Sequence, residues 1–341
     1  MNYALLVAGG TGTRLWPKSR TSLPKQFHNL ISQKSMLKDA YEALLPLYDK
    51  KQIFLVSPKQ YLTNLKKNWP KKYYKNIILE DKSLGTAMAV AIGMKEIAKK
   101  DSKAIVTVIW ADAHIKKHQN FIKAVRLSQQ VASEKKVVII GVRPEYPATG
   151  FGYIKIGKII PGFVKEKVSY IEKFVEKPNY ILAQKFVKSG QYYWNPGIST
   201  WQATHYLEKF NKLMPKHALV LSGKKSIEKL EPTPIDYGIY EKIQGMVTFA
   251  ADLGWSDVGS WKSLKQILAS KKANHISGKH IGLATKNCLV MGKKNLIATL
   301  GVENLAIIDE GDVILVANMD EAEKIKELIL EISKQGLSKY L

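Results

Sequence analysis

The sequence contains a single cysteine, Cys288, which excludes an internal disulfide and a cysteine-based metal cluster. We expect this thiol to be a buried structural residue. Long apolar runs are also missing, because no segment approaches the roughly 20 apolar residues that a membrane span needs. The N-terminal run MNYALLVAGG has no basic n-region and is too short for a secretory signal. These absences predict a cytoplasmic protein without a membrane partner.

Acidic residues are scarce: 29 aspartates and glutamates stand against 53 lysines and arginines, a formal net charge of +24 over 341 residues. This excess of positive charge indicates a polyanionic partner: nucleic acid, anionic lipid or a phosphorylated small molecule. The charge is dispersed along the chain, and no helix-turn-helix, zinc-finger or RNA-reading signature is present. We therefore favour phosphorylated substrates without nucleic acid. A basic nucleic-acid-binding protein is the alternative from another class.

Arginine is rare among the basic residues, with four cases: Arg14, Arg20, Arg126 and Arg143. Two of them lie in the stretch LLVAGGTGTRLWPKSRTSLPKQF, residues 5–27. A planar guanidinium binds phosphate through two parallel hydrogen bonds, which a lysine cannot do. Their position indicates that this stretch recognises phosphate.

Short β-branched runs alternate with helix-like segments through the first half of the chain. We predict strands at 3–9, 52–57, 104–111 and 136–142, and helices at 35–48, 85–100 and 120–134. This order predicts a Rossmann-like α/β fold, with a mostly parallel sheet, helices on both faces and ligands at the carboxyl ends of strands.

The sequence pattern changes from about residue 270. Short strand-like runs there, closely spaced and separated by turn residues, predict a small all-β region. Residues 320–335 then predict a closing amphipathic helix, with Asp320 as its N-cap. We expect two domains, residues 1–268 and 269–341.

The glycine cluster GGTGTR spans Gly9 to Arg14 and follows the first predicted strand. It is not a P-loop, because no Gly-Lys-Ser/Thr follows, and it lacks the third glycine of the dinucleotide fingerprint. Glycines let backbone N–H groups approach an anion closely, and Arg14 and Lys25 could neutralise a triphosphate. A tight turn followed by a solvated basic loop is the structural alternative.

Two aspartates are candidate metal ligands. Asp112 lies in VIWADAHI, immediately after a strongly apolar predicted strand, and Asp257 lies between the tryptophans of DLGWSDVGSW. Mg²⁺ takes one or two carboxylates and completes its shell with water and substrate phosphate oxygens. Solvated strand-end aspartates are the alternative. Glu176 in FVEKPN and Asn195 in YWNPGIST suit sugar hydroxyls, although ordinary turn chemistry explains both segments as well.

Taken together, these motifs resemble the mannose-1-phosphate guanylyltransferases, a family of sugar-phosphate nucleotidyltransferases. Residues 10–27 match every fixed position of that family's Gly-x-Gly-x-Arg-Leu-Trp-Pro-x-Ser-Arg-x-x-x-Pro-Lys-Gln-Phe signature. Similar segments follow in family order: LEDKSLGTAMAVAIG, WADAHI, YPATGFGYI, VEKP, WNPGI, PIDYGIYEK and WSDVGSW. The chain departs from the family pattern at Asp81 and Trp110, where proline is usual, and at Ala113, where histidine is usual.

The resemblance implies a GT-A type fold with a small left-handed β-helix-like C-terminal region. It implies transfer of GMP from GTP to α-D-mannose 1-phosphate with Mg²⁺, although other divalent cations and another sugar 1-phosphate, of a heptose or glucose, are alternatives. A homodimer is compatible with it. It assigns catalysis to Arg14, Lys25, Asp112 and Asp257, the last two as metal ligands. The implied nucleotide-binding residues are Leu6, Ala8, Gly9, Gly10, Gly12, Thr13, Glu80, Gly85 and Thr86. The implied sugar-phosphate residues are Gly152, Glu176, Lys177 and Asn195.

Overall fold

The computed structural model describes residues 1–10, 12–224, 230–269 and 273–341. Its backbone divides into two compact units, each described here by itself. Unit 1 comprises Met1–Gly9, Ala40–Ala111 and Ile115–Trp255, and unit 2 comprises Gly10–Asp39, Asp112–His114 and Ser256–Leu341. Helix α1 (Met36–Leu44) and the short strands β5 (His114–Ile115) and β12 (Trp255–Ser256) lie where the chain passes between units. The domain boundary at residues 268 and 269 stays a prediction.

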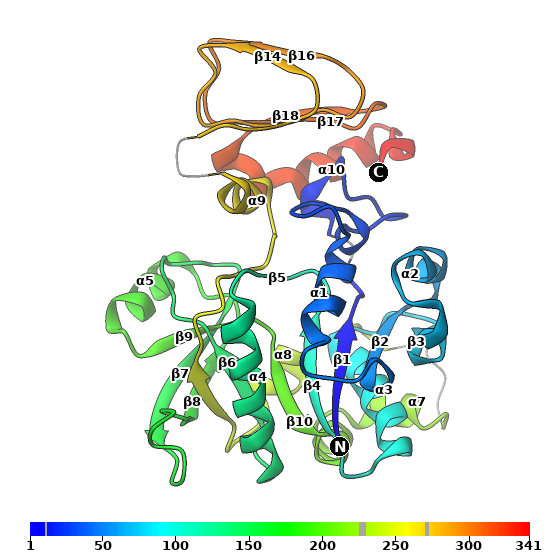
Figure 1. Ribbon diagram of the computed structural model, residues 1–341, viewed down its shortest axis with the longest axis vertical. Coiled ribbons are helices and arrows are strands. Elements are labelled where there is room, and N and C mark those ends of the chain that lie inside the picture. Colours follow the sequence, from blue (N-terminus) through cyan, green and yellow to red (C-terminus); the bar gives the residue numbers. More distant parts are fainter. Residues whose placement is uncertain (11, 225–229, 270–272) are drawn as a thin grey trace. The chain divides into compact units, whose positions relative to one another are not determined.

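Unit 1 is built on a ten-stranded sheet of order β3-β2-β1-β4-β10-β6-β11-β8-β7-β9 (Figure 1). Strands β3, β2, β1 and β4 are parallel neighbours, as are β6 and β11, whereas β10, β8, β7 and β9 pair antiparallel with their neighbours. The strands are β1 (Asn2–Val7), β2 (Ile53–Pro58), β3 (Ile77–Glu80), β4 (Ile105–Trp110), β6 (Val138–Gly141), β7 (Gly152–Ile159), β8 (Ser169–Val175), β9 (Tyr192–Asn195), β10 (Ser199–Gln202) and β11 (Val247–Ala250).

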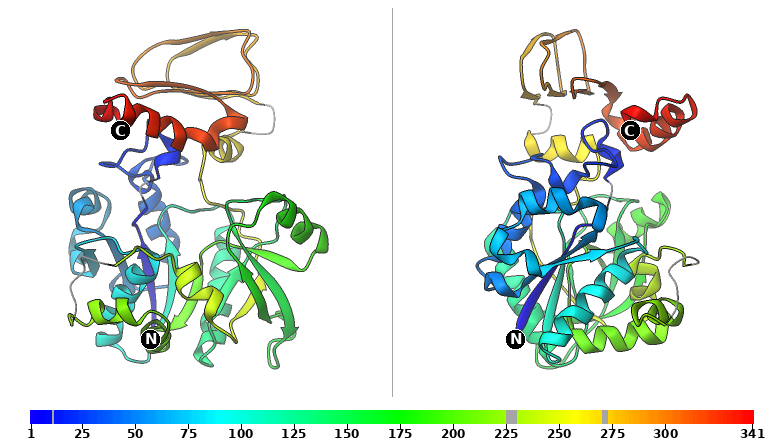
Figure 2. Two further views of the ribbon diagram at one scale, coloured as in Figure 1. Left: turned by 180° about the vertical axis from the view of Figure 1, so that it is seen from behind. Right: turned by 90° about the vertical axis from the view of Figure 1, so that its right-hand side faces the viewer.

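Helices α3 (Thr86–Lys100) and α4 (His118–Ser133) cover opposite faces of this sheet (Figures 1 and 2). Gly93 of α3 lies so close to Leu5 of β1 that a side chain at position 93 would collide with it. On the other face, Ser128 of α4 hydrogen-bonds Thr200 of β10 at 2.8 Å. The other helical segments of unit 1 are η3 (Lys50–Gln52), η4 (Lys59–Tyr61), α2 (Leu62–Asn68), η5 (Lys71–Asn76), α5 (Tyr180–Ser189), α6 (Ala203–Leu213), α7 (Pro215–Leu221), α8 (Ile235–Gly238) and η6 (Tyr240–Lys242).

Unit 2 contains the β-helix-like C-terminal region. Strands β13 (His275–Ser277), β15 (Leu289–Met291) and β17 (Leu305–Asp309) stack in parallel, β18 (Ile314–Asn318) closes that sheet antiparallel, and β14 (His280–Leu283) pairs in parallel with β16 (Ile297–Leu300). The side chains of Asn287 and Asn304 hydrogen-bond at 2.9 Å between successive turns. The predicted α/β class with a β-rich C-terminal region is confirmed, and Cys288 is buried as expected.

The closing segment differs from the prediction at its start. A 3-10 helix, η7 (Met319–Lys324), precedes α10 (Ile325–Lys334), and Asn318 caps it by accepting from the backbone N–H of Asp320 at 2.9 Å. Asp320 is therefore not the N-cap, because Asn318 occupies the extended position before the first turn. Unit 2 also contains η1 (Thr13–Leu15), η2 (Lys25–Phe27), α9 (Trp261–Leu268) and η8 (Ser338–Tyr340).

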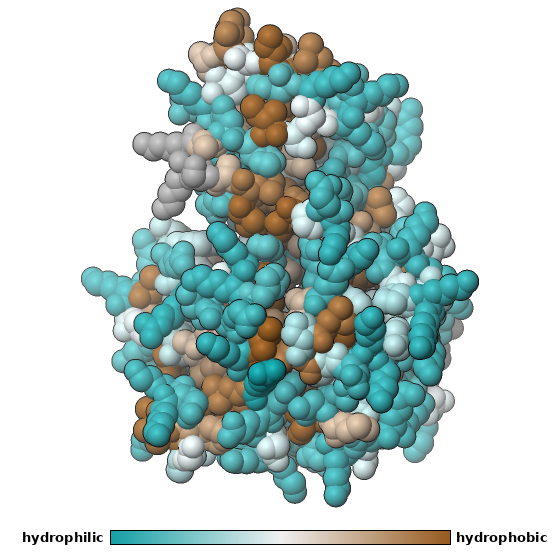
Figure 3. Space-filling view, viewed as in Figure 1, coloured by the Kyte–Doolittle hydropathy of each residue, from teal (hydrophilic) through white to brown (hydrophobic). Residues whose placement is uncertain are grey.

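Hydrophilic side chains dominate the face shown in Figure 3, in keeping with the high charge of the chain. Large apolar residues are also exposed, among them Ile281, Leu283 and Leu300 of the β14–β16 pair. None of the helices in the described ranges combines the length and the apolar content that crossing a membrane requires.

Candidate active site

The glycine loop of unit 2 is shaped around Lys25. Gly12 has φ 63°, in the left-handed region, and a Cβ there would lie 2.7 Å from Cγ of Lys25. Glycine is therefore required twice, by its backbone conformation and by the lysine stem packed against it. A Cβ on Gly10 would have Asp112 Oδ2 as its nearest neighbour, at 3.9 Å. The loop thus passes beside both side chains, although they come from distant parts of the sequence.

Lys25 is held in a defined position by two acceptors. Its ammonium donates to the backbone oxygen of Asp257 at 2.7 Å and pairs with Asp112 Oδ2 at 3.0 Å. The side chain is only 10% exposed, so water screens these contacts weakly. Lys25, Asp112 and Asp257, which are far apart in the sequence, form one cluster in unit 2.

The Asp257 carboxyl is the most desolvated acid of this cluster. Burial raises its pKa, and the charge of Asp112 raises it further, while Lys25, the Gly259 N–H and Arg14 act in the opposite direction. The Gly259 N–H donates to Asp257 Oδ1 at 3.1 Å, and a side chain at Gly259 would collide with the carboxylate. The other three predicted catalytic residues, Arg14, Lys25 and Asp112, therefore all lie within electrostatic range of Asp257. Their roles stay predictions.

Backbone strain accompanies Asp257. The next residue, Val258, has φ 48° although it is β-branched, a conformation that costs on the order of 1–3 kcal/mol. Its side chain is fully buried in the apolar core of unit 2. That packing holds the strained turn and with it the direction of the Asp257 side chain.

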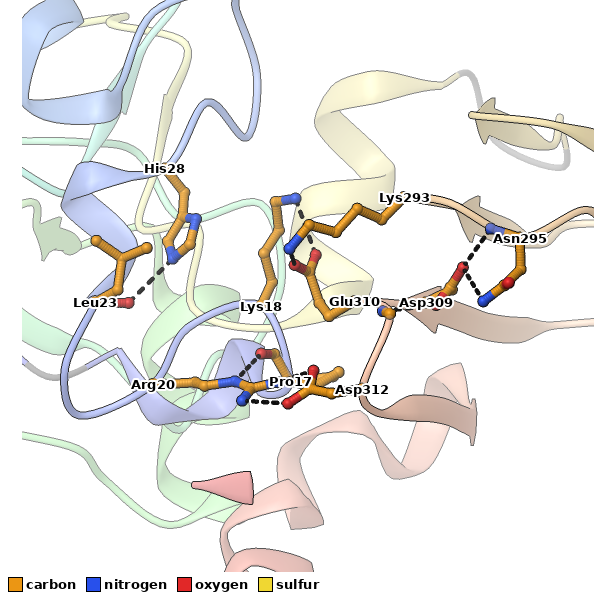
Figure 4. Close-up of polar contacts among 11 residues, drawn as sticks. Pro17, Lys18, Arg20, Leu23, His28, Lys293, Asn295, Asp309, Glu310 and Asp312 are labelled. Atoms are coloured by element: carbon orange, nitrogen blue, oxygen red, sulfur yellow. Dashed lines mark hydrogen bonds and ion pairs between the residues drawn. The ribbon is translucent and has the colours of Figure 1, made fainter. Parts of the chain in front are cut away.

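Arg20 is paired with a carboxylate in the structure, and its role as a phosphate ligand stays a prediction. Its guanidinium donates to both carboxylate oxygens of Asp312, at 2.8 and 2.6 Å, and its Nε donates to the Pro17 oxygen at 3.1 Å (Figure 4). In the same view Lys18 pairs with Glu310 at 3.1 Å. The guanidinium of Arg20 thus binds a carboxylate 292 residues away in the sequence.

Apolar contacts support the same loop. Leu15 and Trp16 belong to the core cluster of unit 2 together with Leu315 and Ile325. The Trp16 indole N–H donates to the Tyr340 oxygen at 2.8 Å. The loop that carries Arg14 and Lys25 therefore packs against the C-terminal region. The sequence offers one signal for this arrangement, the acidic turn DEGD at 309–312, which contributes the partners of Lys18 and Arg20.

In unit 1, the predicted nucleotide residues of β1 serve the sheet. Leu6 is fully buried and pairs with Leu55 and Ile109. Ala8 donates its N–H to Val56 at 3.0 Å and accepts from the Ser57 hydroxyl at 2.7 Å. Their contacts to a nucleotide stay predictions.

Glu80 is an unusual carboxyl in unit 1. It is only 3% exposed, its Oε1 is buried without a hydrogen-bond partner among the described residues, and burial raises its pKa to about 7. Buried polar groups normally have a hydrogen-bond partner. A buried carboxyl oxygen without one, at the end of a strand, is what a ligand-binding residue shows when no ligand is bound.

The start of α3 follows Glu80 closely in the chain and is pinned to the segment before α8. Gly85 has φ 88°, and a side chain there would collide with the Thr233 backbone. The Thr86 hydroxyl accepts from the Ile235 N–H at 2.8 Å. Gly85 and Thr86 are therefore fixed before any ligand binds.

The four predicted sugar-phosphate residues come together in unit 1. Gly152 of β7 and Asn195 of β9 are register partners, and a side chain at Gly152 would collide with the Glu176 carboxylate. Glu176 pairs with Lys177 at 2.8 Å. This ion pair raises the pKa of Lys177, although burial acts to lower it.

Trp110 and Asp81 are two of the three positions at which the chain departs from the family pattern. The Trp110 indole lies against Gly197, which has φ 77°, so that a side chain at Gly197 would collide with it. Trp110 thus packs onto the WNPGI segment that carries Asn195. Asp81 is exposed and lies 3.6 Å from Lys59.

A family model described as Nucleotidyl transferase matches residues 3–274, well over half of the chain. The chain belongs to the nucleotidyl transferase family. A second model, described as MannoseP isomerase/GMP-like beta-helix domain, matches residues 278–332 of this nucleotidyltransferase.

Individual relatives agree with the family match. Mannose-1-phosphate guanylyltransferase 2 of Escherichia coli O157:H7 is 31% identical to this nucleotidyltransferase over 99% of the chain and 75% of its own length. Mannose-1-phosphate guanylyltransferase ManC of Salmonella typhimurium is 31% identical over 98% of the chain and 74% of its own length. The crystal structure of a mannose-1-phosphate geranyltransferase from Thermus thermophilus matches with a TM-score of 0.88 at 30% identity, over 97% of this chain and 99% of that chain.

Sequence reasoning missed three side chains of this nucleotidyltransferase that contact predicted site residues or their loop. Glu310 and Asp312 bind the loop of Arg14 and Lys25, and Asp236 accepts from Asn195 at 3.2 Å. Among the described residues, no group of three or more histidine, cysteine, aspartate or glutamate side chains is arranged to hold a metal ion. A metal here would need substrate or water oxygens beside the two aspartates.

Proposed function

We propose that this nucleotidyltransferase transfers GMP from GTP to α-D-mannose 1-phosphate and forms GDP-mannose and pyrophosphate. The observation that carries the proposal is the convergence of Arg14, Lys25, Asp112 and Asp257 in unit 2. The relatives named mannose-1-phosphate guanylyltransferase, at 31% identity over nearly the whole chain, support the choice of nucleotide and sugar.

In the proposed reaction, a phosphate oxygen of the sugar attacks the α-phosphorus of GTP in line. The bond from the α-phosphorus to the bridging oxygen breaks, and pyrophosphate leaves with the electron pair. No general base is needed, because a phosphate monoester with a second pKa of about 6 is mostly dianionic at neutral pH. The barrier is then electrostatic, since two polyanions must meet, and positioned cations lower it.

Lys25 and Arg14 are the cations that the chain itself provides. Lys25 is aimed by the Asp257 carbonyl and packed against Gly12, so its direction is set before substrate binds. We assign both side chains to the β- and γ-phosphates, where charge builds up as pyrophosphate leaves. The backbone N–H groups of Gly9, Gly10, Gly12 and Thr13 would bind the same anion from the loop side.

Asp112 and Asp257 fit a divalent cation. They offer hard carboxylate oxygens close enough for the charge of Asp112 to raise the pKa of Asp257, a repulsion that a cation would relieve. Two carboxylates are what Mg²⁺ typically takes from a protein when substrate phosphates complete its shell. When bound, Mg²⁺ or another divalent cation supplies neutralisation of phosphate charge.

We assign Glu80, Gly85 and Thr86 to the base and ribose, and Leu6 and Ala8 to the nucleotide as well. A buried carboxyl oxygen without a partner at Glu80 can accept from N–H groups of guanine, which adenine does not offer in the same pattern. Gly152, Glu176, Lys177 and Asn195 are assigned to the sugar phosphate. Heptose and glucose 1-phosphates are the competing substrates.

The test is pyrophosphate release from purified protein with Mg²⁺, each of the four NTPs and a panel of mannose, glucose and heptose 1-phosphates. We expect release with GTP and mannose 1-phosphate above every other pair, and none without a divalent cation. Absence of release with this pair would overturn the proposal, whereas a preference for another sugar would correct the substrate only. A cytoplasmic location and a homodimer belong to the proposal and rest on the sequence alone.

A further inference from the structure

The segment PIDYG, residues 234–238, is part of the family-like segment PIDYGIYEK and has no role in the proposed reaction so far. It forms the short helix α8, which places the Asp236 side chain beside Asn195. The Asn195 amide nitrogen donates to Asp236 Oδ1 at 3.2 Å, and its amide oxygen accepts from the Gly197 N–H at 2.9 Å. Both ends of the Asn195 amide are therefore oriented, one of them by Asp236.

Helix α8 is tied in turn to the start of α3. The Ile235 N–H donates to the Thr86 hydroxyl at 2.8 Å, and the Ala87 N–H donates to the Thr233 oxygen at 3.2 Å. Asp236 thus stands between the loop assigned to the nucleotide and the turn assigned to the sugar. These backbone hydrogen bonds fix the position of the helix that carries Asp236.

Several charged groups face Asp236 from the elements packed around it. Glu176 and Lys177 follow β8, Glu241 lies in η6, and Tyr240 lies beside it in the same short helix. Burial raises the pKa of Asp236 to about 7, and the charges of Glu176 and Glu241 add to this, while Lys177 opposes them. Glu176 itself forms an ion pair with Lys177 at 2.8 Å.

A proton on Asp236 has a chemical advantage at this site. An ionised Asp236 would add a second negative charge beside Glu176, where an anionic sugar phosphate must also bind. A neutral carboxyl has one donor and remaining acceptor capacity, which matches a sugar hydroxyl that both donates and accepts. Because Oδ1 accepts from Asn195, the proton belongs on Oδ2.

We propose that Asp236 is a specificity-determining residue: its carboxyl and the Asn195 amide that it orients bind neighbouring hydroxyls of the hexose 1-phosphate. This inference rests on the proposed function. It identifies the PIDYG segment as a part of the sugar site and makes selection of the sugar dependent on pH.

The test measures kcat and KM for mannose 1-phosphate and glucose 1-phosphate between about pH 6.5 and 9 at saturating GTP. At these pH values the sugar phosphate is largely dianionic, so its own titration contributes little. For the wild type we expect kcat/KM for the sugar to fall about tenfold per pH unit above pH ~7, because at saturating GTP this ratio follows the titration of the GTP-bound enzyme that has no sugar bound. The kcat/KM for GTP at saturating sugar should not follow this profile.

Asp236→Asn keeps a neutral donor and acceptor and should flatten the profile, so that its KM at about pH 8.5 lies below that of the wild type. Asp236→Leu should raise the sugar KM at every pH and reduce the preference between the two sugars at least about tenfold, because a hydroxyl contact is lost. Asp252→Asn is the matched control, since this exposed carboxylate pairs with Lys117 outside the site. Thermal unfolding of each variant checks that it folds.

The outcomes separate the two proposals. A wild-type protein that releases no pyrophosphate with any sugar 1-phosphate overturns the proposed function and the sugar site with it. An active wild type whose pH profile persists unchanged in Asp236→Asn, or whose sugar preference survives in Asp236→Leu, overturns the role of Asp236 alone.

Discussion

Replacement of Lys25 by methionine tests the centre of the proposed active site. Methionine has nearly the same length and can occupy the slot against Gly12, but it removes the ammonium that lies 2.7 Å from the Asp257 oxygen and 3.0 Å from Asp112 Oδ2. The substitution therefore removes charge and hydrogen bonding while it preserves packing.

The expected magnitudes differ sharply between catalysis and stability. Loss of one preorganised donor aimed at transition-state charge typically lowers kcat by about 10²–10³, or about 3–4 kcal/mol. Loss of the hydrogen bond to the Asp257 oxygen costs folding about 1–3 kcal/mol, and loss of the ion pair with the partly exposed Asp112 adds up to about 1 kcal/mol. Together these losses lower the melting temperature of a protein of this size by several degrees. We expect a kcat at least about a hundredfold below wild type in a protein that remains folded.

The assay is the initial rate of pyrophosphate release at saturating GTP and mannose 1-phosphate, with thermal unfolding alongside. Lys155→Met is the matched control, because Lys155 also pairs with a carboxylate, Glu172, but at the surface. Its activity should stay within about twofold of wild type, since exposed ion pairs contribute little. A Lys25→Met variant with a kcat within about tenfold of wild type would refute the reasoning, because the ammonium would then not act on the transition state.

Further predictions concern the loop and Glu80. Gly12→Ala should lower kcat at least about tenfold, as seen in the same assay, because its Cβ would lie 2.7 Å from Cγ of Lys25 and its φ of 63° suits glycine. Arg20→Leu should lower kcat severalfold with less than about 1 kcal/mol lost in urea unfolding, and the double variant Arg20→Asp with Asp312→Arg should recover activity; failure of the exchange to recover it would contradict an anchoring role. Because burial raises the pKa of folded Glu80 from 4.5 to about 7, the unfolded chain releases this proton first, so stability falls as pH rises across that window. Glu80→Gln should abolish this fall and stabilise the ligand-free protein above pH ~7 by up to about 3 kcal/mol in urea unfolding, while GTP binding measured by calorimetry weakens.

The elements of the first half of the chain were predictable from local pattern. A buried parallel strand reads as an unbroken β-branched run, and β1, β2, β4 and β6 begin and end within about three residues of the predicted bounds. The antiparallel strands β7, β8 and β9 were not predicted, because their mixed polar and apolar residues resemble loops until a neighbouring strand pairs with them.

The candidate site was predictable only in part. Glycine at position 12 and a carboxylate directly after β4 are local requirements of backbone conformation and strand geometry, so they are visible in the sequence. The pairing of each charged side chain with its partner depends on how segments far apart in the sequence pack together. Arg20 illustrates this point: its place beside Arg14 predicts a phosphate ligand, but its fork binds Asp312.

By itself the sequence determined the class of fold, the loop at the end of the first strand and the identity of the charged groups, because these depend on residues close together in the chain. Only the tertiary structure decided that Lys25 lies between Asp112 and the Asp257 backbone, and that Asp236 orients Asn195. The physical reason is the same in both cases. Burial sets how strongly two charges interact, and packing sets the direction of a hydrogen bond. Both arise only when segments far apart in the sequence pack together.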